Sequence, residues 1–256
     1  MDWGRAVRDK RKAETLFELT FLGSGNAFAG DRYWSSFALN RRFLFDAPPT
    51  LLAHLNKLDI PTLGIDAVFL SHFHADHFFG LPFLFLDYEY INHRTRELPI
   101  VGPPGVEEAV ERLTELGFPG LARNNQRYRR RYIEVTEGRD YPVLDLTAQA
   151  VRMQHAESLD CFGFKVRLGD RVLAYAGDAE MSPAVLELAE GTDVLVIDCS
   201  CWEGDCGPHI SLDDIRHLRA QVPPRTTFVL THLEPGRPQL DMPGVLLAED
   251  FATFRL

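Results

Sequence analysis

Short apolar segments alternate with polar turns along the whole chain. Alternating or continuously apolar stretches predict strands at 16–22, 36–39, 42–45, 65–70, 99–101, 132–135, 147–153, 161–168, 172–176, 194–198 and 227–230. Apolar residues at helical spacing predict helices at 48–58, 80–91, 106–116, 182–189 and 212–220. Strands and helices mix with no linker between them, which predicts one α/β domain over residues 1–256 with a charged N-terminal arm at 1–15. The pattern also allows two similar halves that meet near residues 105–130.

Composition narrows the class of protein. A chain of 256 residues that is 45% hydrophobic can bury a sizeable core, and its net charge of −10 disfavours nonspecific coating of nucleic acid. The longest apolar run, Phe78–Leu86, falls well short of the ~18 residues that a membrane span requires. The N-terminus lacks the apolar core of a secretory signal, and four cysteines without such a signal indicate free thiols in a reducing compartment. We therefore expect a cytoplasmic protein with no membrane partner.

The most informative segment is His72-x-His74-x-Asp76-His77, which directly follows an apolar strand. Ligand sites in open α/β sheets lie at the carboxyl ends of strands, and burying an unpaired polar group costs ~2–7 kcal/mol. Imidazole and carboxylate together suit zinc or another borderline divalent ion. Alternation in an extended segment lets His72 and His74 bind one ion, while Asp76 and His77 can bind a second after a turn. A histidine-rich surface loop is the alternative interpretation.

Candidate ligands also follow three other predicted strands. His155 follows the strand that ends at Met153, Asp178 follows the strand 172–175, and His232 follows the strand 228–230. Each residue alone would fit a structural role. Because the same placement after a strand recurs, we expect these side chains to converge with the histidine motif.

Several motifs together resemble a known family. The strand and turn Thr20-Phe21-Leu22-Gly23-Ser24-Gly25, the segment Phe43-Leu44-Phe45-Asp46 and the turn Val101-Gly102-Pro103 accompany the histidine motif. The chain resembles the metallo-β-lactamase superfamily over residues 16–235, and within it the branch of ribonuclease Z, arylsulfatases and small phosphodiesterases. The resemblance implies a four-layer αββα sandwich with a centre of two divalent ions, zinc in the first place and manganese or iron as alternatives.

The resemblance also implies a role for each candidate residue. One metal would be held by His72, His74 and His155, the other by Asp76, His77 and His232, and Asp178 would bridge the two. A hydroxide between the ions would attack phosphorus or an acyl carbon, with Asp76 orienting it. Asp46 would orient a ligand imidazole or its loop, although it could instead cap the helix that starts at Pro48.

Two further residues match the ribonuclease Z branch. His209 resembles an additional histidine of that branch, and Asp198 resembles its acidic partner. In this interpretation His209 protonates the leaving group while Asp198 holds the imidazole in place. The alternative is that His209 simply precedes a helix that Ser211 caps.

The leading interpretation is a dinuclear metal-dependent hydrolase, a phosphodiesterase that acts on a small or single-stranded substrate. Transfer-RNA-processing relatives carry a long basic arm, which we would expect between the third and fourth ligand motifs. Here His155 and Asp178 are only 23 positions apart, so tRNA is not the expected substrate. The segment Ala47-Pro48-Pro49 also departs from the residues usual at that point in the family.

Other functions are compatible with parts of the pattern. The same metal ligands would serve a lactone, thioester or aryl sulfate hydrolase of the superfamily. A non-catalytic metal-binding sensor or accessory protein is a third class, which the complete ligand set disfavours. Dinucleotide binding is disfavoured because Phe28 stands where the third glycine of GxGxxG would fall.

Three features leave alternatives open. Residues 123–131 contain five arginines, which could meet an anionic partner or form a solvated edge. The aromatic segment 78–90 could pack in the core, form a homodimer interface or border the active-site mouth. Cys199, Cys201 and Cys206 could hold a third zinc ion, but we expect free buried thiols because no paired CxxC spacing is present.

Overall fold

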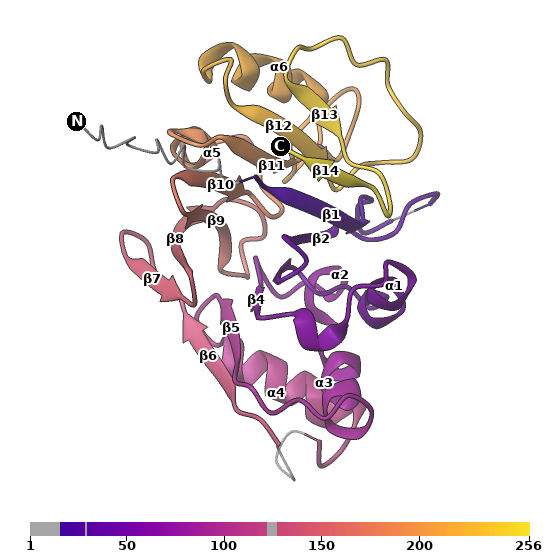
Figure 1. Ribbon diagram of the computed structural model, residues 1–256. Helices are drawn as coiled ribbons and strands as arrows, with labels where there is room; N and C mark the ends of the chain where they lie inside the picture. The colour runs from indigo at the N-terminus through magenta and orange to yellow at the C-terminus, as the bar shows by residue number, and fades with distance from the viewer. Residues whose placement is uncertain (1–15, 29, 122–126) are drawn as a thin grey trace, which may run out of the picture.

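The computed structural model describes residues 16–28, 30–121 and 127–256 (Figure 1). The arm predicted at 1–15 and Arg123 of the basic segment lie outside these ranges. None of the helices within the ranges has the length and apolar character that a membrane span requires.

The strands of the described residues form two sheets of seven. The first sheet has the order β14 (Thr253–Arg255), β1 (Glu18–Gly23), β2 (Ser36–Leu39), β3 (Phe43–Phe45), β4 (Ala67–Phe69), β5 (Leu98–Gly102) and β6 (Arg130–Glu134). The second has the order β13 (Val245–Leu247), β12 (Thr227–Thr231), β11 (Val194–Asp198), β10 (Arg171–Tyr175), β9 (Cys161–Leu168), β8 (Leu146–Met153) and β7 (Asp140–Val143). Strands β3 to β6 and β10 to β13 are parallel, and the remaining pairs are antiparallel.

Alternate residues of the central strands face two different apolar layers. In β4, Phe69 belongs to a core shared by both sheets, whereas Val68 packs with the helices outside the first sheet. In β11, Val196 lies in the shared core and Leu195 packs with the helices outside the second sheet. Because successive side chains of a strand point to opposite faces, strands that are apolar throughout are buried on both sides.

Aromatic rings join the two sheets. Phe45 stacks between Phe37 and Phe69, with ring centroids 4.7 and 4.9 Å away. Phe164 of β9 meets Phe69 edge-on at 5.4 Å, which brings a ring of the second sheet against the first. Such ring pairs contribute about 0.5–1.5 kcal/mol beyond the burial of their area.

Helices cover the outer faces. Helices α1 (Leu51–Lys57), α3 (Leu81–Tyr90) and α4 (Val106–Gly117) pack on the first sheet, and α5 (Pro183–Ala189) and α6 (Leu212–Gln221) pack on the second (Figure 1). Two shorter elements, η1 (Thr62–Gly64) and α2 (Ala75–Phe78), lie between strands of the first sheet. The arrangement is helix, sheet, sheet, helix, which confirms the predicted four-layer αββα sandwich.

The structure differs from the sequence predictions in a few places. Residues 75–78 form helix α2 where we expected a loop, because four residues are too few to show a helical period. Strands β7, β13 and β14 have only three or four residues and were missed for the same reason. The chain passes from the first sheet to the second between β6 and β7, at 135–139 and not near 105–130, because β6 still pairs with β5.

The aromatic segment 78–90 divides between core and surface. Phe78, Phe85 and Tyr88 are buried, which confirms core packing for these three. Phe83 and Tyr90 are exposed. The homodimer interface stays a prediction, which gel filtration would test.

Candidate metal centre

The predicted metal ligands gather where strands of both sheets end. His72 and His74 follow β4, His155 follows β8, Asp178 follows β10 and His232 follows β12. Asp76 and His77 lie on α2, directly after His74. The carboxyl ends of these strands meet at one edge of the sandwich, which is where parallel strands place a ligand site.

Unusual backbone conformations let the loops approach each other. Asp46, just after β3, and His232, just after β12, both have a φ of 57°. Gly177 has a φ of 64°, and a Cβ at this position would lie 2.6 Å from Cβ of Ser71. Only glycine fits this close approach, which brings Asp178 against the histidine motif.

The first group of side chains consists of three imidazoles and one carboxylate. His74 Nδ1 lies 2.9 Å from His72 Nε2 and 3.3 Å from His155 Nε2. Asp178 Oδ2 lies 3.9 Å from His72 Nε2 and 3.7 Å from His155 Nε2. These four ligand atoms all lie within 4.8 Å of one another, as one metal ion would require.

The second group contains Asp76, His77 and His232. Asp76 Oδ2 lies 3.3 Å from His77 Nε2 and 3.7 Å from His232 Nε2. Asp178 Oδ2 also approaches these two nitrogens, at 3.3 and 3.2 Å. Asp178 therefore lies between both groups, in the place predicted for a bridging carboxylate.

Asp46 orients two of the imidazoles. Its Oδ2 accepts from His77 Nδ1 at 2.7 Å and from the Ser71 hydroxyl at 2.8 Å, and its Oδ1 accepts from the Ser71 backbone N–H. The Ser71 oxygen in turn lies 3.0 Å from His72 Nδ1. Because the Ser71 hydroxyl donates its hydrogen to Asp46, its oxygen accepts from Nδ1 of His72. The imidazoles of His72 and His77 therefore both direct Nε2 toward the centre.

Asp198 makes the same arrangement on the second sheet. Its Oδ2 lies 2.7 Å from His209 Nδ1, and its Oδ1 accepts from the Ser200 hydroxyl at 2.6 Å. The Ser200 oxygen lies 2.7 Å from His232 Nδ1. One buried carboxylate therefore holds His209 directly and His232 through a serine.

The third imidazole of the first group is oriented by the backbone. His155 Nδ1 lies 2.9 Å from the carbonyl oxygen of Pro208, which can only accept. The proton of a neutral His155 is therefore on Nδ1, and the lone pair of Nε2 faces His74 and Asp178.

Burial and neighbouring charges shift the ionisation of these groups in opposite directions. Burial, with His77 beside it, holds the pKa of His72 well below its usual range. Burial alone would lower the pKa of His232, but Asp178 and Asp198 raise that pKa to about 10. The pKa of Asp178 lies well below its usual range in spite of burial, because His232 and His77 stabilise the carboxylate. The centre thus keeps its carboxylates ionised, as metal ligands must be.

The donor set fits divalent cations. His77 Nε2, His232 Nε2 and Asp178 Oδ1 are buried without a hydrogen-bond partner among the described residues. Buried polar atoms of this kind are rare, and a bound divalent cation would satisfy them. Imidazole nitrogens with their other nitrogen hydrogen-bonded, together with carboxylates, are typical zinc ligands.

His209 lies beside the second group. Its ring stacks on His232 at 5.1 Å and lies 4.7 Å from the ring of His155. The alternative reading of this segment also holds, since Ser211 and Asp214 form a capping box at the start of α6. His209 can therefore lie beside the second ligand group while Ser211 caps α6. The role of His209 as a proton donor stays a prediction.

Sequence reasoning missed three orienting groups. Tyr175, at the end of β10, donates from its hydroxyl to Asp46 Oδ2 at 2.6 Å, and both residues are buried. Within an apolar strand it looked like a core residue. Ser71 and Ser200 each lie within two positions of a predicted site residue, which was the only available signal.

The prediction of free thiols was wrong for two of the cysteines. Cys201 and Cys206 form a disulfide, with Cα atoms 5.9 Å apart, so they are not free thiols. Spacing alone could not show this, because the pairing depends on the path of the loop between them. Cys161 and Cys199 are free and buried, as expected. The cysteines form no metal-binding group within the described ranges.

The four described arginines of the basic segment each pair with a glutamate. Arg127 pairs with Glu89, Arg130 with Glu111, and both Arg129 and Arg131 pair with Glu97. This pairing favours a charged edge of the fold over a site for an anionic partner.

Comparison with known proteins agrees with this architecture. The sequence model of the family described as "Anti-Pycsar protein Apyc1" matches residues 17–251. The chain belongs to this family. A ribonuclease Z from Methanosarcina acetivorans is 26% identical to this Apyc1-family chain over 270 residues, which cover 85% of the chain and 88% of the relative.

Solved structures share the fold of this Apyc1-family chain. The metallo-β-lactamase fold protein YhfI from Bacillus subtilis has a TM-score of 0.75 at 19% identity, covering 94% of this chain and 99% of that one. The short form of human tRNase Z (ELAC1) has a TM-score of 0.75 at 23% identity, covering 93% and 98%. The chain is a member of the metallo-β-lactamase superfamily in its ribonuclease Z-like branch, which confirms the resemblance seen in the sequence.

Proposed function

We propose that this chain is a dinuclear metal-dependent hydrolase that cleaves phosphodiester bonds in small or short single-stranded substrates. The observation that carries the proposal is the position of Asp178. Its Oδ2 lies 3.2 to 3.9 Å from four imidazole nitrogens that belong to two ligand groups. A carboxylate so placed supports two adjacent cations, and zinc suits the donors, with manganese and iron as alternatives.

Each site residue would have a specific role in this reaction. His72, His74 and His155 would hold one ion, Asp76, His77 and His232 the other, and Asp178 both. When bound, such a pair lowers the pKa of a water and stabilises negative charge on the substrate oxygens. Asp76, the most exposed carboxylate of the set, would orient the attacking water.

His209 would donate a proton to the leaving group. Its Nδ1 is held by Asp198 at 2.7 Å, which directs Nε2 away from that carboxylate. A positioned imidazole of this kind contributes about 10²–10⁴-fold when the leaving group is a poor one. The nearby ring of His232, 5.1 Å away, places His209 beside the second ligand group and supports this role.

A compact substrate is favoured by the segment between His155 and Asp178. Strands β9 and β10 fill it as a hairpin with Gly169-Asp170 at the turn. Both strands of the hairpin are internal strands of the second sheet, so this stretch offers no arm to clamp a folded RNA.

The decisive experiment is hydrolysis of bis(p-nitrophenyl) phosphate by protein freed of metal and reconstituted with zinc or manganese. We expect activity only with added metal, up to about two ions per chain by elemental analysis. His74→Ala should lower activity at least about 100-fold, while His217→Ala, an exposed histidine on α6, should leave it unchanged.

The other candidate functions are outcomes of the same experiment. Cleavage of a lactone, thioester or aryl sulfate in place of the diester would assign the ester-hydrolase function. Metal content below about one ion per chain, with no turnover, would indicate a non-catalytic protein. Cleavage of a precursor tRNA in preference to small diesters would overturn the compact-substrate proposal.

A further inference from the structure

A disulfide closes the loop that leads to Pro208. It joins Cys201 and Cys206, which are five positions apart. Pro208 follows two positions later, and its carbonyl oxygen lies 2.9 Å from Nδ1 of His155, one of the predicted metal ligands. We call residues 201–208 the disulfide loop. Its covalent link ends next to the group that orients His155.

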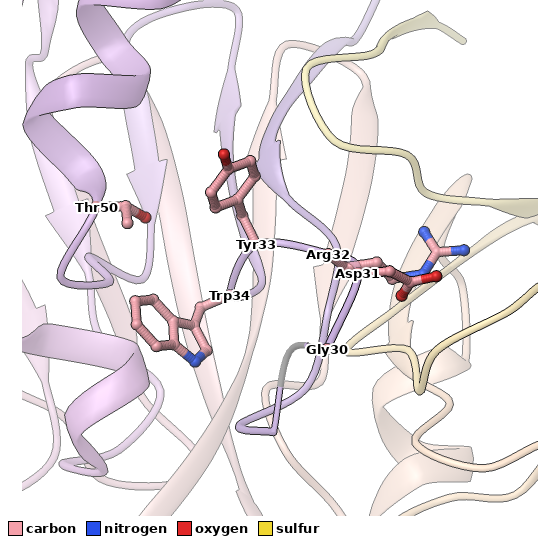
Figure 2. Close-up of a pocket in the computed structure, with 6 residues that line it drawn as sticks. All are labelled: Gly30, Asp31, Arg32, Tyr33, Trp34 and Thr50. Atoms are coloured by element: carbon pink, nitrogen blue, oxygen red, sulfur yellow. The ribbon is translucent and has the colours of Figure 1, made fainter.

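The start of the disulfide loop is anchored by hydrogen bonds. Trp202 donates its backbone N–H to Glu234 and its indole N–H to the carbonyl oxygen of Pro235 at 3.1 Å. Arg32 holds the next residue, because its guanidinium donates to the carbonyl oxygen of Gly236 at 3.0 Å. Figure 2 shows this guanidinium directed away from the neighbouring aromatic rings. The start of the loop therefore keeps its place without help from the disulfide.

The rest of the disulfide loop has no comparable anchor. Within the described ranges, no hydrogen bond or ion pair joins residues 203–205 to the protein outside the loop. Gly204 and Gly207 have φ values of 81° and 60°, and a Cβ on either would meet no atom within 4 Å. Glycine has the widest choice of backbone conformations. Pro208 is therefore held on one side by His209, which Asp198 binds, and on the other side through the disulfide.

The base of the loop is fixed by the backbone. The Ser200 N–H donates to the carbonyl oxygen of Ile210 at 3.0 Å, and the Leu212 N–H donates to that of Cys201 at 2.9 Å. Ser200 is the residue that orients His232. Opening the disulfide would therefore free the loop and leave the orientation of His232 unchanged. The first ligand group, which contains His155, depends on the disulfide, and the second does not.

The disulfide can be reached from solution. Cys201 and Cys206 are partly exposed, whereas Cys161 and Cys199 are buried. Exposed disulfides are the ones that thiols reduce most readily. A thiolate attacks one sulfur and forms a mixed disulfide, which a second thiol then cleaves. Two small thiols are thereby oxidised to one disulfide, and their two protons and two electrons pass to the protein cysteines.

We propose that Cys201–Cys206 is a redox modification site through which small thiols set the metal content of the candidate centre. In the oxidised protein the loop presents the Pro208 carbonyl oxygen to His155. Reduction releases this carbonyl, His155 loses its fixed orientation, and the first ligand group binds its ion less tightly. The inference rests on the metal centre of the proposed function and adds its regulation.

The test measures zinc affinity by competition with a chelating dye. Oxidised protein is compared with protein reduced by glutathione, which is then removed under nitrogen. We expect reduction to weaken one of two ions about 10–100-fold, the usual cost of a lost orienting group, and to change the other less than about twofold. Reoxidation with glutathione disulfide should restore the first affinity.

Two variants separate the disulfide from other effects of the treatment. The double variant Cys201→Ser/Cys206→Ser should bind zinc as the reduced protein does, and glutathione should not change it further. Glu203→Gln alters an exposed residue of the same loop and keeps the disulfide, so it should bind both ions as the wild type does. A double variant with wild-type affinity for both ions would overturn the proposal.

A second measurement does not need metal. The Nδ1 proton of His155 should give a slowly exchanging imidazole resonance in metal-free oxidised protein, identified by its absence from His155→Gln. Reduction should remove this resonance. Its retention in protein with four free thiols, or equal weakening of both ions, would overturn the proposal. If the protein binds no zinc in either state, the proposed function fails, and the resonance alone decides the role of the disulfide.

Discussion

Ser71 and Ser200 occupy equivalent places on the two sheets. Each hydroxyl donates to a buried carboxylate and accepts from Nδ1 of an imidazole at 3.0 and 2.7 Å respectively. The carboxylates, Asp46 and Asp198, each hold a second imidazole directly. The centre is therefore oriented by two matching networks, one from each half of the sandwich.

Ser200→Ala should weaken metal binding. Without the hydroxyl, His232 Nδ1 loses its partner and the ring loses its fixed orientation. Removal of such an orienting group typically costs about 10–100-fold in metal affinity. Competition with a chelating dye measures the affinity directly.

Ser182→Ala is the matched control for that variant. The Ser182 hydroxyl is also buried but has no hydrogen-bond partner within the described ranges. It should leave metal affinity unchanged. Equal affinities for the wild type and Ser200→Ala would show that the serine network does not orient His232.

Tyr175→Phe should destabilise the fold through Asp46. The lost hydrogen bond ends on a buried carboxylate, and bonds to charged groups contribute about 1.5–3 kcal/mol. Tyr88→Phe removes a bond of 2.8 Å to the neutral carbonyl oxygen of Thr62, for which about 0.5–1.5 kcal/mol is expected. Urea unfolding of the two variants gives the comparison, and a larger loss for Tyr88→Phe would contradict it.

His209→Asn should slow the cleavage of poor leaving groups selectively. A proton donor matters for an alkoxide and little for p-nitrophenolate, so we expect about a 100-fold loss on a dinucleotide and a small loss on the nitrophenyl ester. The metal content should stay at the wild-type value. Loss of metal would instead make His209 a ligand with Asp178 and His232, a group whose donor atoms also lie within 4.8 Å of one another.

The four cysteines should differ in reactivity toward a thiol reagent at pH 8. Burial raises the pKa values of the Cys161 and Cys199 thiols, so neither forms a thiolate at this pH, and Cys201 and Cys206 are joined. Native protein should therefore show no reactive thiol, denatured protein two, and denatured protein after reduction four. Four thiols before reduction would refute the disulfide.

The convergence of the candidate metal ligands could be predicted because their chemistry is visible in the sequence. His155, Asp178 and His232 each follow an apolar strand, and parallel strands of a sandwich end at one edge. The αββα layers could be predicted from the alternation of strands and helices together with the family resemblance. Neither step required knowledge of long-range contacts.

The orienting groups could not be predicted in the same way. In the sequence, Tyr175 resembles the other apolar residues of β10. Its hydroxyl can hold Asp46 only because folding brings these two residues, which are 129 positions apart in sequence, to a distance of 2.6 Å. The disulfide depends on the path of one loop.

The pairing of β14 with β1 sets an order of events during synthesis on the ribosome. Thr20 of β1 pairs with Thr253 of β14, and Glu18 with Arg255, so one side of β1 has no partner until almost the whole described chain has emerged. Until then this strand presents free backbone groups to any neighbouring nascent chain, a known route to aggregation. The first layer of the sandwich to be translated is therefore the last to be completed.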